Sequence, residues 1–351
     1  MGYKVIHVGT GNVGRFALQA ILRNPELELV GHYVNSPEKV GKDSGELIGQ
    51  PKAGVTATNN WADLYDLGAD CLIYFGDNIG REEEAIRDLV PFLERGTNAI
   101  TFSGFTLAHP DLTPPHQRKM IDDACAKGNS TCFFTGMDPG WATTDLAIAA
   151  LTAADQVDCV RVCELGYFGD YTAEMAMRDY FGFGRDKDFV PVFAGGGFAE
   201  QMWTPTLQVI ADVLGKEIEE VKLVWETDGL DYDIETGFGP VKAGTTAYLH
   251  FELQALNDGK PFVIVEHVDS CTRDISKMKW KRPHADVDLA YRIEIEGSPS
   301  FDLELSWRKD GEIMSSMAVI NAVPVVCAAE PGLAGVLDLP RYGPIKRTVR
   351  G

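Results

Sequence analysis

The sequence predicts two domains: a doubly wound α/β domain built on a parallel sheet, followed by an α+β domain with a mainly antiparallel sheet. Three observations carry this prediction. The chain has 351 residues, which is too long for one average domain. From Lys4 to about Gly140, short β-branched runs alternate with amphipathic stretches, as in βαβ units. After about Asp145 the strands are longer, alternating and consecutive, which favours antiparallel pairing.

The first domain is expected to span residues 1–145. Apolar residues at helical spacing predict the helices Arg15–Leu22, Arg81–Arg95 and Pro115–Lys127. The expected parallel strands are Lys4–Val8, Leu27–Tyr33, Cys71–Phe75, Asn98–Thr101 and Cys132–Thr135.

The second domain, residues 146–315, is expected to bind substrate or form a dimer. Helices are predicted near Asp145–Ala153 and Pro205–Leu214, and Gly195–Gly197 and Asp231–Gly244 are interpreted as loops. An apolar helix at Met317–Ala329 lies in a final segment, 316–351, that is expected to pack back on the first domain. The expected strands are Val157–Tyr167, Thr245–Ala255, Phe262–Asp269, Leu289–Glu296 and Ser300–Arg308.

Composition excludes several classes of partner. With 32 basic and 52 acidic residues the formal charge is −20, which disfavours nucleic acid and anionic membranes. No apolar run has membrane-spanning length, and Met1–Lys4 leads straight into a strand rather than a signal peptide. The seven cysteines show no CxxC pairs. We expect a cytoplasmic protein with reduced thiols.

Glycines at 9, 11 and 14 form a GxGxxG pattern directly after an apolar strand and directly before a helix. Gly9 permits the tight turn, Gly11 lets the backbone approach a pyrophosphate, and Gly14 lets the helix pack on the strand. This context predicts a Rossmann dinucleotide site. The loop residues assigned to it are Gly9, Thr10, Gly11, Asn12, Val13 and Gly14, with the N–H groups of Asn12 and Val13 facing the phosphates.

The end of the second strand bears on the choice of dinucleotide. An NAD site usually has an acidic residue there, whereas this chain has Asn35 and Ser36, followed by Lys39. These groups can bind a 2′-phosphate, so NADP(H) is preferred. Glu38 is the contrary observation, and it leaves NAD(H) open.

Further cofactor contacts are expected beyond the carboxyl ends of the other parallel strands, where ligands bind in such sheets. Asp77 has the alternative role of a helix N-cap. The residues assigned are Phe75, Gly76, Asp77, Phe102, Ser103 and Gly104, together with Asn321 near the C-terminus.

Five segments together resemble the dihydrodipicolinate-reductase-like superfamily, and within it the branch of 2,4-diaminopentanoate dehydrogenase and the native amine dehydrogenases. The resemblance covers nearly the whole chain. It implies a homodimer that binds NAD(P)H in the first domain, holds a small-molecule substrate in the cleft facing the second, and transfers hydride to an imine carbon. The segments are VIHVGTGNVG (5–14), SPEKVGKDSGEL (36–47), TGMDPGW (135–141), GPVKAG (239–244) and NAVPVVCAAEPGLAGVLDLP (321–340).

One departure from the family concerns its catalytic glutamate. In amine-forming members this residue follows the strand after the second helix, but the matching stretch Thr101–Pro110 contains no carboxylate. A positioned acid or base contributes roughly 100- to 10,000-fold, or about 3 to 5 kcal/mol. Hydride transfer itself needs no protein carboxylate. The sequence therefore favours reduction of a C=O or preformed C=N bond in a small apolar ketone or imine.

Ser103, Thr106 and His109 are candidate catalytic groups in that stretch. The alternatives are hydroxyls that bond the turn backbone and a loop histidine exposed to water. The resemblance adds Tyr171 as a pocket hydroxyl. Apolar residues are candidates for the substrate pocket, although core or dimer interface is the alternative for each: Phe105, Met137, Phe168, Tyr171, Met175 and Met177.

Other chemistries find less support. His267 with Asp269, and His284, have no companion residues at metal-ligand spacing, so no metal is expected. No GxSxG motif indicates hydrolysis. Two alternative functions stay open: a redox-sensing dinucleotide-binding protein, and an amino-acid dehydrogenase of the diaminopimelate dehydrogenase type with Arg178 and Arg185 as a carboxylate clamp.

Overall fold

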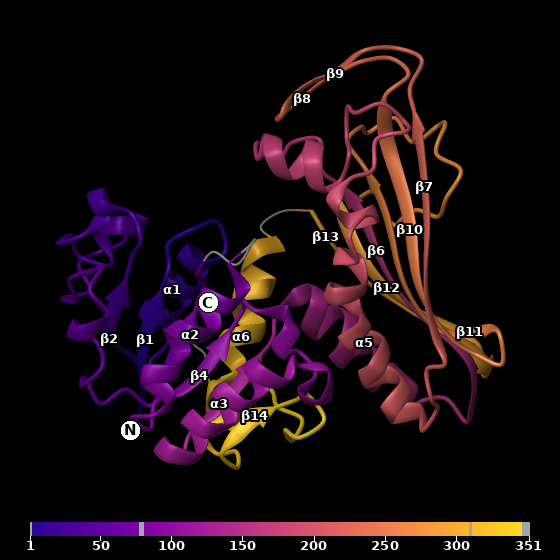
Figure 1. Cartoon of the computed structure of the whole chain (residues 1–351). Helices are drawn as coiled ribbons and strands as arrows, with labels where there is room; N and C mark the ends of the chain where they lie inside the picture. Colours follow the sequence, from indigo (N-terminus) through magenta and orange to yellow (C-terminus); the bar gives the residue numbers. More distant parts are fainter. Residues whose placement is uncertain (1, 77–80, 309–310, 346–351) are drawn as a thin grey trace, which may run out of the picture. The chain divides into compact units, whose positions relative to one another are not determined.

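The computed structural model describes residues 2–76, 81–308 and 311–345. The chain forms two compact units (Figure 1). One comprises Met1–Trp141 and Asp310–Gly351, and the other comprises Ala142–Lys309. The chain therefore leaves the first unit at Trp141 and returns to it with its last helix.

The first unit is built on a six-stranded sheet in the order β14-β5-β4-β3-β1-β2. Every neighbouring pair is parallel, which confirms the doubly wound α/β prediction. Because βαβ crossovers cover both faces of such a sheet, its strands are nearly continuous apolar runs. The strands are β1 (Tyr3–Val8), β2 (Leu27–Tyr33), β3 (Cys71–Tyr74), β4 (Asn98–Thr101), β5 (Thr131–Phe134) and β14 (Gly332–Ala334).

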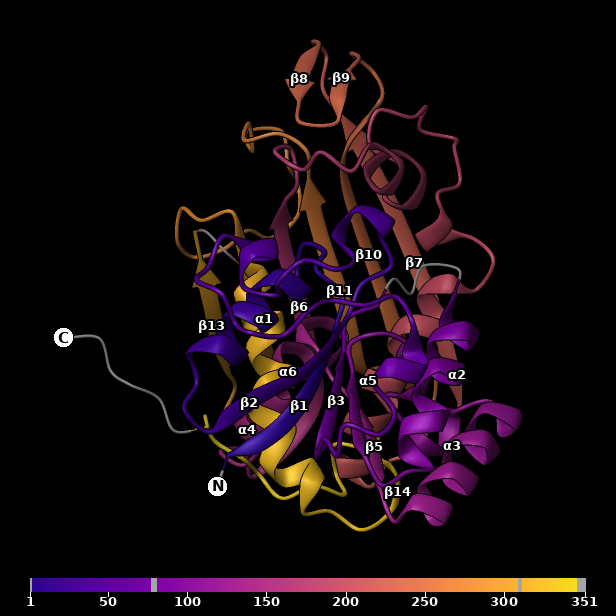
Figure 2. The same cartoon turned by 90° about the vertical axis from the view of Figure 1, so that its left-hand side faces the viewer.

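Helices cover both faces of this sheet (Figure 2). α1 (Gly14–Arg23) and α6 (Gly311–Cys327) pack together on one face, where Ile21, Val319 and Val323 join one core with the strands. α2 (Glu82–Leu93) and α3 (Pro115–Gly128) pack together and contact β4 and β5. No helix within the described residues is both long and apolar enough to cross a membrane.

The second unit contains a six-stranded sheet in the order β13-β12-β6-β11-β10-β7. All neighbours are antiparallel except the parallel pair β6 and β11, so the predicted mainly antiparallel sheet is confirmed. Its strands are β6 (Gln156–Tyr167), β7 (Glu220–Gly229), β10 (Thr246–Asn257), β11 (Lys260–Ser270), β12 (Leu289–Ser298) and β13 (Phe301–Trp307).

The two faces of this second sheet are covered differently. α4 (Leu146–Leu151) and α5 (Phe198–Leu214) lie on one face, which we call the helix face. On the opposite face, Met278 and Trp280 from the irregular segment 271–288 pack against β-strand residues such as Cys163. Because successive side chains of a strand point to opposite faces of the sheet, each strand places one set of residues on the helix face and the other set on the opposite face.

Several predicted elements need correction. The segment Asp231–Gly244 is not only loop, because it holds the hairpin of β8 (Ile234–Thr236) and β9 (Gly239–Val241). Helix α5 begins at Phe198 rather than Pro205, which lies inside it. Short helical turns, which the sequence did not predict, lie at Pro37–Lys39, Glu46–Ile48, Trp61–Asp63, Phe105–Leu107, Pro110–Leu112, Ala176–Tyr180 and Val192–Ala194. The segment Met137–Asp145 is interrupted by non-helical backbone at Asp138, Pro139 and Gly140.

Candidate dinucleotide-binding site

A pocket of about 460 Å³ lies in the first unit where β1, β2, β3 and β4 end. Each of these strands is followed by residues that line it, which is the usual ligand position in an open parallel sheet. The lining belongs entirely to the set that the sequence assigns to a dinucleotide: Gly9, Thr10, Gly11, Asn12, Val13, Gly14, Asn35, Ser36, Lys39, Phe75, Gly76 and Phe102.

The glycine loop has the shape that a pyrophosphate requires. Gly9 has φ +92°, and a Cβ there would collide with the carbonyl oxygen of Phe75. A Cβ on Gly14, where α1 begins, would lie 2.8 Å from the carbonyl oxygen of Gly9. Gly11 has nothing within 4 Å of its Cβ position, so its backbone is open to a ligand. The open backbone and the N-terminus of α1 together fit a dinucleotide phosphate.

Two buried histidines lie beneath this loop. His7 Nε2 is 2.6 Å from the carbonyl oxygen of Gly9, so this nitrogen donates the hydrogen bond. His32 Nδ1 lies 2.9 Å from Ser44 Oγ, and the two imidazole centroids are 5.4 Å apart. Burial, and then the mutual repulsion with His32, lowers the pKa of His7 to about 3. Burial, and then the charge of Lys39, lowers the pKa of His32 to about 4.

One end of the pocket is positively charged. The ammonium of Lys39 donates to Thr10 Oγ1 at 2.9 Å, which holds it beside the glycine loop. Asn35 and Glu38 are exposed, and Ser36 is half-buried. The residues that line the described pocket include no carboxylate. This end therefore suits an anionic substituent.

The remaining predicted cofactor contacts have other positions. Asp77 lies outside the described residues. Ser103 Oγ donates to the carbonyl oxygen of Gly76 at 2.6 Å and so ties together the loops after β3 and β4. Gly104, with φ +83°, precedes the turn at Phe105–Leu107. Asn321 Oδ1 accepts from the backbone N–H of Ile345 at 3.2 Å.

The candidate catalytic groups near Thr101–Pro110 hold the loop together. Thr106 Oγ1 donates to Gln117 Oε1 at 2.8 Å, and Thr113 Oγ1 donates to the carbonyl oxygen of Thr106 at 2.9 Å. His109 Nδ1 accepts from the backbone N–H of Asp111 at 3.3 Å. His109 is buried, so its interpretation as a loop histidine exposed to water is wrong.

The candidate pocket residues are found in contrasting environments. Phe105 and Met137 are buried in the first unit. Phe168 and Met177 belong to the core of the second unit. Tyr171 is 41% exposed with its ring 5.2 Å from that of Phe168, and Met175 is 64% exposed.

The arginines considered as a carboxylate clamp are both ion-paired. Arg178 binds Glu174 at 3.0 Å and donates to the carbonyl oxygens of Phe238 and Pro240. Arg185 binds Asp179 at 2.6 Å. Neither guanidinium is held ready for a substrate carboxylate, so a clamp gains no support.

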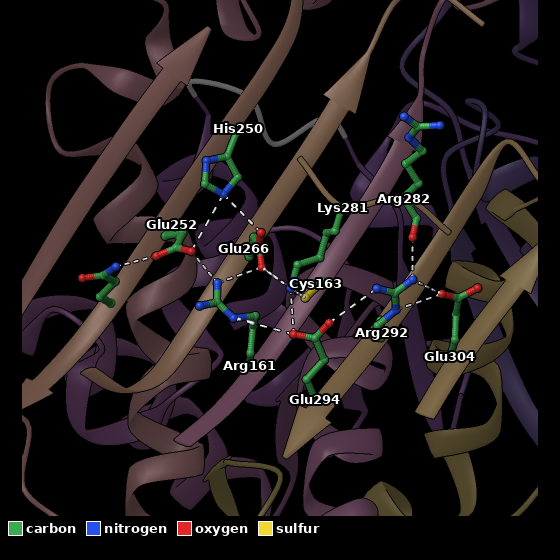
Figure 3. A network of polar contacts seen from close by, with 11 residues as sticks. Arg161, Cys163, His250, Glu252, Glu266, Lys281, Arg282, Arg292, Glu294 and Glu304 are labelled. Carbon is green, nitrogen blue, oxygen red and sulfur yellow. Dashed lines mark hydrogen bonds and ion pairs between the residues drawn. The ribbon is translucent and has the colours of Figure 1, made fainter. Parts of the chain in front are cut away.

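A polar network on the second sheet, opposite the helix face, was not predicted from the sequence (Figure 3). Glu266 lies at its centre and binds the guanidinium of Arg161 at 2.8 Å, the ammonium of Lys281 at 3.0 Å and His250 at 3.1 Å. Burial raises the pKa of Glu266, but the His250 hydrogen bond and the two positive charges outweigh this effect and lower it well below its ordinary value. Further members of the network are Cys163, Glu252, Glu294, Arg292 and Glu304.

Two groups in this network have metal-ligand spacing. Cys163, Glu266 and Glu294 offer atoms within 4.8 Å of one another, as do His250, Glu252 and Glu266. The ammonium of Lys281 already lies 2.7 Å from Glu294 and 3.8 Å from Cys163 Sγ. Protein cations therefore neutralise these carboxylates. All seven cysteines are free thiols.

Comparisons with known proteins agree with this geometry. The dihydrodipicolinate reductase N-terminus model matches residues 3–83, and the 2,4-diaminopentanoate dehydrogenase C-terminal domain model matches residues 143–350. An amine dehydrogenase from Streptomyces virginiae is 28% identical over 97% of both chains. A 2,4-diaminopentanoate dehydrogenase from Acetoanaerobium sticklandii is 23% identical over 96% of this chain and 93% of its own.

A solved structure supports the fold. The amine dehydrogenase from Mycobacterium smegmatis superposes with a TM-score of 0.74 at 19% identity, covering 98% of this chain and 97% of its own.

The chain is an NAD(P)-dependent oxidoreductase of dihydrodipicolinate-reductase-like architecture. Three features define this class: the glycine loop at the pocket, the doubly wound sheet of the first unit and the mixed sheet of the second. Within that class, the chain belongs to the 2,4-diaminopentanoate dehydrogenase family, whose C-terminal domain model covers more than half of it.

Proposed function

We propose that this enzyme prefers NADP(H) and reduces the C=O or C=N bond of a small, mainly apolar ketone or imine. The observation that carries the proposal is the glycine-lined pocket with the Lys39 ammonium at one end. Kinship with an amine dehydrogenase and a 2,4-diaminopentanoate dehydrogenase supports chemistry at a carbon bearing nitrogen.

The residues of the first unit have defined tasks in this proposal. The dinucleotide, when bound, supplies the hydride. The backbone N–H groups of Asn12 and Val13 bind its phosphates at the N-terminus of α1. Lys39, Ser36 and Asn35 bind the 2′-phosphate, and the rings of Phe75 and Phe102, with centroids 5.5 Å apart, form an apolar wall.

Thr101–Pro110 supports reduction of a ketone or preformed imine. This stretch has no carboxylate, and the hydroxyls of Ser103 and Thr106 bond to groups of their own unit. A carboxylic acid that protonates the reduced product would therefore come from elsewhere in the chain, and His109 is the candidate proton donor within the stretch. The candidate substrate contacts stay a prediction for each unit by itself: Phe105 and Met137 in the first, and Phe168, Tyr171, Met175 and Met177 in the second, with Tyr171 contributing a hydroxyl.

The direct test measures NADPH oxidation with a panel of small ketones and cyclic imines, with and without ammonia. We expect turnover of ketones or preformed imines without ammonia. Turnover that strictly requires ammonia would contradict this part of the proposal. Tight NADPH binding with no turnover of any substrate would favour the redox-sensing alternative.

We also propose that the enzyme is a homodimer, on the basis of the family resemblance, and that it is cytoplasmic, on the basis of its cysteine pattern. Light scattering of the purified protein tests the oligomeric state, and a monomeric mass would contradict it.

A further inference from the structure

Four polar side chains form a compact cluster on the helix face of the second sheet. They are Glu164 on β6, His267 and Asp269 on β11, and Tyr291 on β12. Strand register places Glu164 directly opposite both His267 and Tyr291. Tyr291 Oη donates to Glu164 Oε2. His267 Nδ1 is 3.7 Å from Glu164 Oε1 and 3.8 Å from Asp269 Oδ2.

The surroundings of this cluster are apolar. The same rows of the sheet continue with Val162, Val265 and Ile293, all buried in the core. The imidazole of His267 stacks on Phe251 at 4.5 Å between centroids and lies 4.7 Å from Trp203. Burying carboxylates in apolar surroundings lowers the stability of the folded state, because they lose their hydration, whereas apolar residues of similar size would not have this cost. A cluster of this kind is therefore a candidate for chemistry rather than for stability.

The backbone makes room for the cluster. Gly166 pairs with Asp269 across β6 and β11. A Cβ at Gly166 would lie 2.8 Å from Asp269 Oδ1 and would collide with the ring of Phe168. A side chain at this position would shift the Phe168 ring or the Asp269 carboxylate, so the glycine leaves room for the cluster.

We propose that Glu164 is the catalytic acid and base of this enzyme, and that Tyr291 and His267 are positioning residues that fix its carboxyl group. The inference rests on the proposed function. Of the two carboxylates, Glu164 has the longer side chain and is 9% exposed, whereas Asp269 is 0% exposed. Glu164 is therefore the carboxylate of this pair with some access to the surface, and Asp269 lies against the imidazole of His267.

The proton balance of the reduction is simple. Hydride bonds to the carbonyl or imine carbon with its electron pair, and the π pair moves to the oxygen or nitrogen. That atom takes a proton from the carboxyl group of Glu164, which is left as a carboxylate and is reprotonated from water. In the oxidative direction the carboxylate accepts the same proton. The carboxyl group thus supplies the acid that Thr101–Pro110 lacks.

A purely structural role is the alternative, and Glu266 provides a matched control. This glutamate is also buried, at 3% exposure, adjoins His267 in the chain, and belongs to the network on the opposite face of the same sheet (Figure 3). We expect Glu164→Gln to lower kcat by at least about 100-fold, with the Kd for NADPH unchanged within about twofold and Tm unchanged or higher. We expect Glu266→Gln to lower Tm, with kcat within about threefold of wild type at a temperature where it is folded.

Tyr291→Phe gives a second test that does not depend on the first variant. If Tyr291 positions the carboxyl group of Glu164, Tyr291→Phe should shift the midpoint of the pH dependence of kcat/KM that this carboxyl group causes. In Glu164→Gln that part of the pH dependence should be lost. The inference is overturned if Glu164→Gln keeps its kcat, or if Tyr291→Phe lowers Tm and leaves the pH profile unchanged. A wild-type enzyme inactive toward every ketone and imine would overturn the proposed function and this inference together, whereas an active wild type with an equally active Glu164→Gln variant overturns this inference alone.

Discussion

Lys39 places an ammonium group in the lining of the dinucleotide pocket, bonded to Thr10. A hydrogen bond between charged groups contributes about 1.5–3 kcal/mol. We therefore expect Lys39→Ala to raise the Kd for NADPH roughly 10- to 100-fold and the Kd for NADH less than about threefold. Fluorescence titration with both cofactors measures this. Lys52→Ala, which removes an exposed lysine paired with Glu46, is the control and should change neither Kd. An equal loss for both cofactors would contradict a 2′-phosphate contact.

The buried histidines beneath the glycine loop predict acid sensitivity. The pKa of His7 is lowered to about 3 and that of His32 to about 4, whereas an unfolded histidine titrates near 6.5. Below about pH 6.5 the unfolded state thus binds protons that the folded state does not, and stability falls as pH falls. Each histidine contributes about 1.4 kcal/mol per pH unit between pH 6.5 and its folded pKa.

Urea unfolding at pH 7 and pH 5 measures this effect. The two histidines together should remove about 4 kcal/mol between these pH values. His32→Gln should halve the loss, and the control variant His116→Gln, at an exposed position, should leave it unchanged. If the free energy of unfolding of the wild type does not change from pH 7 to pH 5, His7 and His32 are not buried in the neutral form.

At the residue scale, sequence reasoning reaches furthest where a site depends on local spacing. The positions of Gly9, Gly11 and Gly14 are sufficient to predict a phosphate loop, because the turn, the phosphate contact and the helix start are contiguous. The partnership of Glu164 with His267 and Tyr291 depends on register between strands far apart in sequence. No spacing rule reveals such a contact, although polar residues within otherwise apolar strands were a visible signal.

Among the elements, α6 shows how the end of the chain completes the first unit. Ile320 is fully buried with Val319 and Val323 in the core of the parallel sheet, and Ser316 Oγ donates to the carbonyl oxygen of Val13 at 2.9 Å. Replacing a large aliphatic core residue by alanine costs about 2–5 kcal/mol. We expect this loss for Ile320→Ala and less than about 0.5 kcal/mol for Ile313→Ala, whose side chain is 38% exposed on the same helix. Denaturant unfolding tests both, and equal losses would contradict the packing.

Element boundaries differ from the sequence predictions for identifiable reasons. Strands β2 and β4 match because turn residues precede each of them, Asn24 and Pro25 before β2 and Gly96 before β4. The sequence predicts a helix that begins at Pro205, but α5 begins about two turns earlier, at Phe198. The additional turns bury Ala199 and Trp203 in the core of the second unit. The β8–β9 hairpin escaped prediction because its strands have three residues each. The sequence analysis did not predict β7, although Val221, Leu223 and Trp225 alternate with other residues as in a strand.

For the molecule as a whole, the dinucleotide pocket lies within one unit only. A ligand that binds only the native state at 100 times its Kd stabilises that state by about 2.7 kcal/mol. We expect NADPH to raise the melting temperature of the first unit by roughly 5–10 °C and to leave the second unit's transition in place. Differential scanning calorimetry with and without NADPH measures both, with NADH, which lacks the 2′-phosphate, as a weaker ligand for comparison. A shift confined to the other transition would contradict the assignment of the pocket.

The return of the chain to its first unit has a consequence for biosynthesis. The outer strand β14 pairs with β5 only after residues 332–334 have left the ribosome, and Ser316 reaches the glycine loop shortly before. Until then β5 is an open sheet edge, which favours pairing with other chains. The second unit, whose residues are contiguous, can fold earlier in translation than the unit that precedes it. The nucleotide loop thus receives structural support from a residue that is synthesised 303 positions after it.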